Sequence, residues 1–322
     1  MVKLQKIIKR AEERKVAIGH FNVSNLEMLK AVSRVTQKLN IPVIIGVSEG
    51  EREYLGVHRI RDLVVSYNNE YAFNIGKPTL SRGLISQKLK SIRGEIESSK
   101  VGCQLFLNAD HTYSLEKVRE AAQNGFDMIV FDGSKMPLEE NIQKTKEAVQ
   151  AAKKINKNVI IEGELGYIGS GSVVRREIPK DVAINPEDLT RPEEAARFVR
   201  ETGVDMLAPA VGNIHGMFAN APEPRLNIER IREIKKAVKI PLVLHGASGN
   251  TDEDLRAAIE AGISVIHIST ELRVAWRKGL ETALKENPEE IAPYKLMPEG
   301  LVKMEKVIEN RLKLFTPDLF NK

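Results

Sequence analysis

The chain has 322 residues, of which 49 are Lys or Arg and 44 are Asp or Glu, and its formal net charge is +5 at pH 7. Hydrophobic residues make up 42% of the sequence, which is enough to bury a full core, whereas an aromatic content of 5% is too low for base-stacking platforms. The basic residues are spread along the chain, so the charge suits anionic substrates and is only a weak signal for nucleic acid, and we expect no nucleic-acid partner.

The location expected from the sequence is the cytoplasm. The chain has one cysteine, Cys103, which excludes a disulfide framework and indicates a reducing compartment. The first residues, Met1 to Lys6, lack the apolar core of a signal peptide, and no apolar run reaches the roughly 18 residues of a membrane span. We therefore expect no membrane partner.

Eight short apolar segments alternate with helical patterns along the chain. After an amphipathic helix at 3–14, strands are predicted at 16–21, 41–47, 103–107, 127–132, 158–164, 205–210, 241–245 and 264–268. Many of the helical patterns end in a glycine-containing turn that returns the chain to the sheet. Apolar strands alternating with helices predict a parallel sheet covered on both sides, and eight such units predict a single-domain α/β fold of the (β/α)8 barrel type.

Two long connections and a tail extend this pattern. Residues 50–100 separate the second and third strands and predict inserted helices. Residues 165–190 form a glycine-rich connection after the fifth strand, which is either a lid over the working face of the barrel or a surface excursion. The barrel is expected to occupy about 1–280, and the helical tail, 281–322, to pack outside it or on a partner subunit.

Ionisable side chains collect where the strands end. Asp110 and His111 follow the third strand, and His215 and His245 follow the sixth and seventh. The carboxyl ends of barrel strands converge on one pocket, so three imidazoles there predict a catalytic zinc site with an open position. A lone histidine in a turn is usually structural, but three on one face favour a metal.

Acids and small residues surround the same strand ends. Asp132 follows the fourth strand, and Glu162 and Glu164 share one side of the fifth, where they either hold histidine tautomers or bind a second metal. Glycine follows both His215 and His245, which lets backbone N–H groups approach an anion. The loops after strands seven and eight often bind phosphate in such barrels, so a phosphate-bearing substrate is expected.

Four segments together resemble the class II fructose-bisphosphate aldolases and their tagatose-bisphosphate relatives. These segments are residues 108–111, 162–166, 208–216 and 245–249, and residues 19–23 and 47–50 match early segments of that family. The resemblance runs in consistent order from about residue 3 to residue 280. It is specific to the superfamily but much less specific to one sugar.

The resemblance implies a role for each matching residue. His111, His215 and His245 match the ligands of the catalytic zinc, and Asp110 matches the acid/base for the hydroxyl next to the cleaved carbon–carbon bond. Asp132 and Glu164 match an alternative metal position. The dihydroxyacetone-phosphate site is implied at Ser48, Gly216, Gly246, Ala247, Ser248, His267, Ile268, Ser269 and Thr270.

The implied activity is a lyase reaction of carbohydrate metabolism. A ketose 1,6-bisphosphate, by default fructose 1,6-bisphosphate, would be cleaved reversibly to dihydroxyacetone phosphate and an aldehyde such as glyceraldehyde 3-phosphate. The family also implies a monovalent cation (Na⁺ or K⁺) near the phosphate and a homodimer or homotetramer.

Two departures from the family pattern favour tagatose bisphosphate or another phosphorylated sugar as the alternative substrate. His267 stands where the family has asparagine, and it could replace one hydrogen bond, carry charge toward phosphate or make a fourth metal contact. The loop's acidic pair is replaced by residues 170–173, which leaves Glu177 as the nearest acid. Arg175 and Arg176 either bind a second anionic group or are solvated.

Two other functions fit the sequence less well. A barrel metallohydrolase would also gather histidines and an acid around zinc, but the paired phosphate loops would have no role there. An inactive sugar-phosphate sensor is disfavoured because the three predicted zinc ligands and Asp110 are all present.

Overall fold

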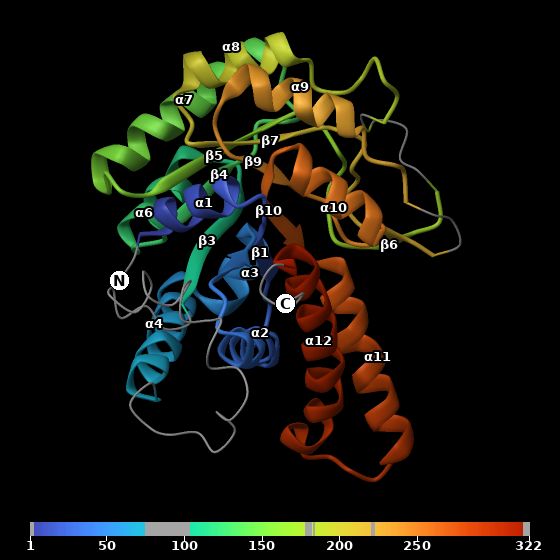
Figure 1. The fold of residues 1–322 in the computed structure, drawn as a ribbon. Coiled ribbons are helices and arrows are strands. Elements are labelled where there is room, and N and C mark those ends of the chain that lie inside the picture. The colour runs from blue at the N-terminus through green and yellow to red at the C-terminus, as the bar shows by residue number, and fades with distance from the viewer. Residues whose placement is uncertain (1–2, 75–103, 178–181, 183, 220–222, 318–322) are drawn as a thin grey trace, which may run out of the picture.

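The computed structural model describes residues 3–74, 104–177, 182, 184–219 and 223–317. Eight parallel strands form a closed barrel in the order β1-β10-β9-β7-β5-β4-β3-β2, as the sequence predicted (Figure 1). The strands of the barrel are β1 Ile18–Asn22, β2 Val43–Val47, β3 Leu105–Thr112, β4 Met128–Phe131, β5 Ile160–Leu165, β7 Met206–Pro209, β9 Leu242–Leu244 and β10 Ile263–Ile268.

Helices surround the barrel and cover its strands. Apolar residues at helical spacing form the buried face of α2, for example, where Leu29, Val32 and Val35 are buried. The helices up to the last barrel strand are α1 Leu4–Glu13, α2 Leu26–Leu39, α3 Glu49–Leu55, α4 Val57–Asn74, α6 Leu115–Gln123, α7 Leu138–Ile155, α8 Pro192–Thr202, α9 Ile228–Val238 and α10 Asp252–Ala261.

Side-chain alternation along the strands divides the apolar core into two parts. Residues such as Val43 and Ile45 pack outward against the helices, whereas Ile44 and Phe106 fill the barrel interior. Helix α1 contributes Leu4 and other residues to the interior cluster, so it covers one end of the barrel. The polar residues of the interior collect toward the carboxyl ends of the strands.

The first predicted insertion is helical where the structure describes it. Ser48 caps α3 by accepting a hydrogen bond from the Glu51 backbone N–H, and the Glu51 carboxylate accepts one from the Ser48 backbone N–H in return. Helix α4 follows directly. The rest of the insertion, and Cys103, lie outside the described residues.

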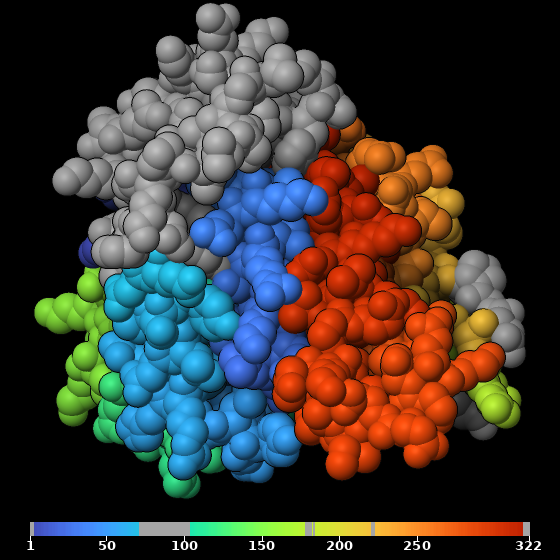
Figure 2. Space-filling model, turned by 90° about the horizontal axis from the view of Figure 1, so that it is seen from below, coloured from blue at the N-terminus to red at the C-terminus, as the bar shows by residue number. Residues whose placement is uncertain are grey.

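The second insertion and the tail also have defined parts. After β5, the short strand β6 Val174–Arg175 pairs with β8 Met217–Phe218. The tail forms α11 Thr270–Glu286 and α12 Pro293–Phe315. These two helices lie side by side and α12 packs outside the barrel, with Met304, Ile308 and Leu312 in the main core (Figure 1). Figure 2 shows the pair on the opposite side of the lower face from α4.

No helix within the described residues is long and apolar enough to cross a membrane. This finding agrees with the absence of a long apolar run in the sequence.

Asp127, just before β4, provides a pH test of the fold. Its carboxylate accepts a hydrogen bond from the Leu107 backbone N–H at 2.9 Å, and burial raises its pKa to about 6. An unfolded aspartate has a pKa of about 3.9, so between about pH 4 and 6 the folded state binds more protons. The stabilisation from this proton is present below about pH 4 and lost as the pH rises through 6.

We expect Asp127→Asn to gain thermal stability relative to wild type as the pH rises from 4 to 7.5. The asparagine oxygen can still accept the Leu107 hydrogen bond, but it carries no buried charge at high pH. Melting temperatures of both proteins at the two pH values test this expectation. The same difference at both would contradict it.

Candidate active site at the carboxyl ends of the barrel strands

An irregularity in β3 brings two neighbouring residues to the same pocket. Adjacent residues of a regular strand point to opposite faces, and Ala109 faces the helices while Asp110 is buried beside interior residues. The pairing of β3 with β4 shifts register between Ala109 and Thr112, and His111 has φ of 43°. This left-handed conformation is uncommon for a residue other than glycine, and it turns His111 back toward Asp110.

Three histidines predicted from the sequence converge in the structure. Nitrogen atoms of His111, His215 and His245 all lie within 4.8 Å of one another. The ring centroids of His111 lie 4.9 Å from His215 and 5.1 Å from His245. The Nδ1 of His215 contacts the Gly169 carbonyl oxygen at 2.8 Å, which fixes that ring and leaves Nε2 for a ligand.

Carboxylates contact the other two rings. The Glu162 Oε1 lies 2.6 Å from His245 Nε2, so Glu162 fixes the orientation of that ring. The His111 Nδ1 lies 2.9 Å from Glu164 Oε1 and 3.1 Å from Asp132 Oδ2. Glu164 and Asp132 form a second cluster with His111, so their position suits both predicted roles, partner of a histidine and ligand of a second metal. Glu162 lies against His245 and so has the position of a histidine partner.

The buried nitrogen atoms of the three histidines show whether this cluster could bind a metal ion. His245 Nδ1 is buried and has no hydrogen-bond partner among the described residues. It faces the cluster because Nε2 is held by Glu162. Three imidazole nitrogens at this spacing, each ring oriented by an oxygen, suit Zn²⁺ and similar divalent ions. The residues present therefore fit a bound metal.

Burial and charge together set the ionisation of the site. Burial lowers the pKa of His215 to about 3. For His245, burial opposes protonation, but Glu164 and Glu162 outweigh it and raise the pKa to about 8. Burial by itself would raise the pKa of Asp110, but His111 and His267 hold it well below the usual value. Asp110 is therefore a carboxylate at neutral pH.

Asp110 belongs to a buried polar network that the sequence interpretation missed. Asn22 donates to Asp110 Oδ2 at 2.8 Å and contacts Glu51 Oε2 at 3.3 Å. Glu51 in turn accepts a hydrogen bond from Arg273 at 2.6 Å. Arg52, also buried, donates to the Asp110 carbonyl oxygen at 3.1 Å. Side chains from three elements, β1, α3 and α11, therefore fix the end of β3.

His20 is the other missed residue. Its ring stacks on that of His267, with centroids 3.4 Å apart and planes within 5°. His20 and His267 are paired in register on β1 and β10. Strands one and eight of a closed barrel are neighbours, so histidines at matching positions on them could have been recognised as a pair.

The residues matched to the dihydroxyacetone-phosphate site lie around the ends of β2, β7, β9 and β10. Ser248 Oγ accepts from the Ser269 backbone N–H at 3.3 Å, which joins the loops after β9 and β10. Ser269 precedes α11, whose first residue is Thr270, so a helix N-terminus begins here. Ile268 packs in the core outside the barrel, which leaves only its backbone for the site.

The loop after β9 is tied to the C-terminal helix. Glu271 accepts a hydrogen bond from the Gly249 backbone N–H at 2.8 Å. Arg311 of α12 donates to the other oxygen of Glu271 at 2.9 Å and to Asp252 at 3.0 Å. The glycine loop is therefore held by a charged pair as well as by its own backbone.

The loop after β5 contacts the site through two residues. Ser172 Oγ donates to Ser269 Oγ at 2.8 Å. Arg175 donates to the carbonyl oxygens of His215 and Ser170, at 2.9 and 2.6 Å. These two bonds tie Arg175 to the chain, and its contact with a second anionic group stays a prediction. Arg176 and Glu177 are exposed at the end of this described segment.

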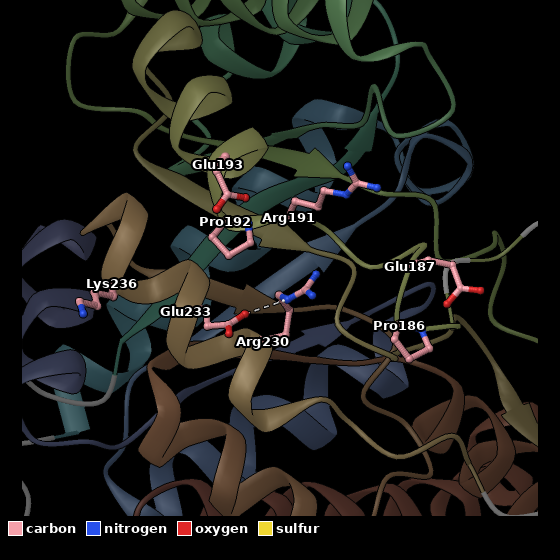
Figure 3. Close-up of a pocket in the computed structure, with 8 residues that line it drawn as sticks. All are labelled: Pro186, Glu187, Arg191, Pro192, Glu193, Arg230, Glu233 and Lys236. Atoms are coloured by element: carbon pink, nitrogen blue, oxygen red, sulfur yellow. Dashed lines mark hydrogen bonds and ion pairs between the residues drawn. The ribbon is translucent and has the colours of Figure 1, made fainter.

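A surface pocket of about 550 Å³ lies elsewhere, between α8 and α9 on the outside of the barrel (Figure 3). Its charges are mixed, with Arg191, Arg230 and Lys236 beside Glu193 and Glu233. Arg230 is paired with Glu233 at 3.1 Å. Because its lining holds no histidine and its Arg230 is paired with an acid, we place the chemistry at the strand ends.

The sequence model of the family described as "Fructose-bisphosphate aldolase class-II" matches residues 2–318. The chain belongs to this family. The aldolase is therefore a lyase of a metal-dependent family, as the resemblance implied.

Relatives of the aldolase differ in substrate. A protein of Staphylococcus aureus (strain Mu50) named fructose-bisphosphate aldolase is 29% identical over 316 residues, which cover 98% of this chain and 97% of the relative. A 6-phospho-5-dehydro-2-deoxy-D-gluconate aldolase of Shouchella clausii is 32% identical over 314 residues, which cover 98% and 94%.

Solved structures support the same assignment. The YdjI aldolase of Escherichia coli K12 has a TM-score of 0.71 at 29% identity, covering 98% of the aldolase and 96% of that chain. A putative fructose-1,6-bisphosphate aldolase of Coccidioides immitis has a TM-score of 0.74 at 25% identity, covering 97% and 96%.

Replacement of one histidine tests the metal site. We expect His215→Ala to lose most of its bound zinc because only two imidazoles would remain. Metal content of the purified protein, measured by mass spectrometry, checks this. His58→Ala, at an exposed histidine on α4, is the control. Full zinc content in His215→Ala would show that His215 is not a ligand.

Proposed function

We propose that this aldolase reversibly cleaves a ketose 1,6-bisphosphate to dihydroxyacetone phosphate and an aldehyde. Fructose 1,6-bisphosphate, with glyceraldehyde 3-phosphate as the aldehyde, is the default substrate. The observation that carries the proposal is the convergence of His111, His215 and His245 beside the buried Asp110. A metal-ligand cluster next to an ionised carboxylate suits carbon–carbon cleavage without a covalent intermediate.

The three histidines would hold a divalent ion, which we propose is zinc. A zinc ion bound there supplies Lewis-acid stabilisation of the negative charge that develops on the ketose oxygens during cleavage. Glu162 keeps His245 in the orientation that directs Nδ1 to the cluster. Glu164 and Asp132 orient His111 in the same way and form the alternative metal position.

Asp110 is the proposed acid/base. Its carboxylate is ionised because neighbouring imidazoles lower its pKa, so it can accept the proton of the substrate hydroxyl next to the breaking bond. It returns that proton in the condensation direction. Positioned acid/base groups typically contribute about 10²–10⁴-fold to the rate.

The phosphate of the dihydroxyacetone half is proposed to bind among Gly216, the 246–248 loop and the start of α11. Glycine at 216 and 246 adopts positive φ there, 110° and 60°, conformations that turn backbone N–H groups out of regular hydrogen bonding. Binding this remote group holds the reacting end in place. As in the family, the proposal includes a monovalent cation near the phosphate, a homodimer or homotetramer, and a cytoplasmic location.

The sugar is tested by a coupled assay of dihydroxyacetone-phosphate release. We expect release from at least one of three substrates, fructose 1,6-bisphosphate, tagatose 1,6-bisphosphate and 6-phospho-5-dehydro-2-deoxy-D-gluconate, and its loss on chelation. The third is included because relatives with that name match over the whole chain. Release from the third substrate alone would overturn the assignment to a ketose bisphosphate, and no release from any of them in the zinc-loaded enzyme would refute the proposed cleavage reaction.

Asp110→Asn tests the acid/base role. We expect this variant to keep its zinc and its fold but to lose cleavage by at least about 10²-fold, because the amide cannot accept the proton. Metal content and turnover are measured on the same preparation. Unchanged turnover would rule out Asp110 as the acid/base.

A further inference from the structure

His267 lies buried inside the site, where the asparagine of the family pattern gives it no role. Its ring is sandwiched between two other imidazoles, with centroids 3.4 Å from His20 and 3.9 Å from His245. We propose that His267, with its ring plane fixed by His20, positions the Asp110 carboxylate for proton transfer. This inference rests on the proposed function and assigns a task to the residue that replaces the family asparagine.

Asp110 is approached on both of its oxygens. Asn22 donates to Oδ2 at 2.8 Å, and His267 Nδ1 lies 3.5 Å from Oδ1. This second distance is longer than the roughly 2.7–3.2 Å of a formed hydrogen bond. Contacts of catalytic groups commonly shorten to that range when substrate binds. Asn22 therefore holds Oδ2, whereas Oδ1 is buried without a hydrogen-bond partner among the described residues and faces His267.

Ligand atoms of His267 lie within 4.8 Å of those of His20 and Asp110, and of those of Glu162 and His245. The stacking of the rings nevertheless argues against His267 as a metal ligand. An imidazole binds a metal in the plane of its ring. The His267 and His245 planes are tilted by 25° and stacked face to face, so an ion in the plane of His245 lies away from the plane of His267. The His20 and His267 planes are nearly parallel, which likewise prevents these two rings from sharing an ion.

The orientation of the His267 ring decides which of its two nitrogen atoms faces Asp110. Of the two ring nitrogens, Nδ1 is the one that lies toward Asp110 Oδ1, at 3.5 Å, so it is the nitrogen placed to donate to that oxygen. Nε2 is buried without a hydrogen-bond partner among the described residues. The ring therefore directs its donor at Asp110.

His20 is held in place by neighbouring strands. Asn108 contacts His20 Nε2 at 3.0 Å. Gly46, on the adjacent strand β2, leaves room for the ring, since a Cβ at that position would overlap it. His20 is entirely buried. Packing from three strands thus fixes the plane on which His267 rests.

The test uses the zinc-loaded enzyme and separates two reactions. Cleavage of the ketose bisphosphate requires transfer of the hydroxyl proton by Asp110. Exchange of a dihydroxyacetone-phosphate C–H proton with solvent deuterium does not involve that hydroxyl.

Two variants separate the ring of His267 from its N–H group. His267→Phe keeps a flat ring in the stack but removes the N–H, and His267→Asn keeps an N–H without the ring. His58→Phe, at the exposed histidine of α4, is the matched control.

We expect His267→Phe to lose kcat for cleavage by about 10²-fold, as misplacement of a reacting group does. KM, zinc content and the deuterium-exchange rate should stay near wild type. His267→Asn should lose less. In an Asp110→Asn background, His267→Phe should lower kcat for cleavage no further, because both residues act through one carboxylate.

Three outcomes would overturn the proposal. If the cleavage rate, the deuterium-exchange rate and the melting temperature all fall in His267→Phe, the role of His267 is in packing. A raised KM with unchanged kcat would indicate a substrate contact, and lost zinc would indicate a ligand. If His267→Phe does not fold, the same measurements are made on His267→Asn. If instead the proposed aldolase function is wrong, the wild-type protein itself will show no metal-dependent cleavage. That result is distinguishable from the three outcomes above, which concern the variants.

Discussion

Pairing of buried carboxylates with imidazoles is the constraint on which the site depends. Glu162, Glu164 and Asp110 are at most 2% exposed, and a carboxylate buried without a partner would cost several kcal/mol or take up a proton. Each of the three lies within 4 Å of an imidazole. The contacts that compensate these charges also fix the ring orientations, so stability and metal-ligand geometry have the same origin.

The barrel was predictable because its signals are local. Apolar strands and glycine-ended helices repeat along the chain, and the closed sheet has the expected eight members. The prediction was least accurate at β3, which extends to Thr112 although its apolar run ends at Leu107. All but Ala109 of the remaining residues are polar, and they lie in the sheet because they are paired with buried groups at the barrel mouth. Hydrophobic periodicity cannot detect a strand of that kind.

The convergence of the histidines was predictable from their places at strand ends, whereas the contacts among them were not. The positive φ of His111 comes from a register shift that has no sequence signature. The stack of His20 on His267 depends on barrel closure, which joins the first and last strands. Arg175 binds carbonyl oxygens because its loop folds back on the chain, an outcome that loop composition does not reveal.

The bond from Arg311 to Glu271 has a consequence for how the protein is made. The glycine loop that Glu271 holds follows β9, but Arg311 lies in α12, after every barrel strand. During synthesis the barrel strands therefore leave the ribosome before the charge that secures this loop is available. Domains fold largely as their chain emerges, so a nascent barrel would close first, and its glycine loop would be fully secured only when α12 docks.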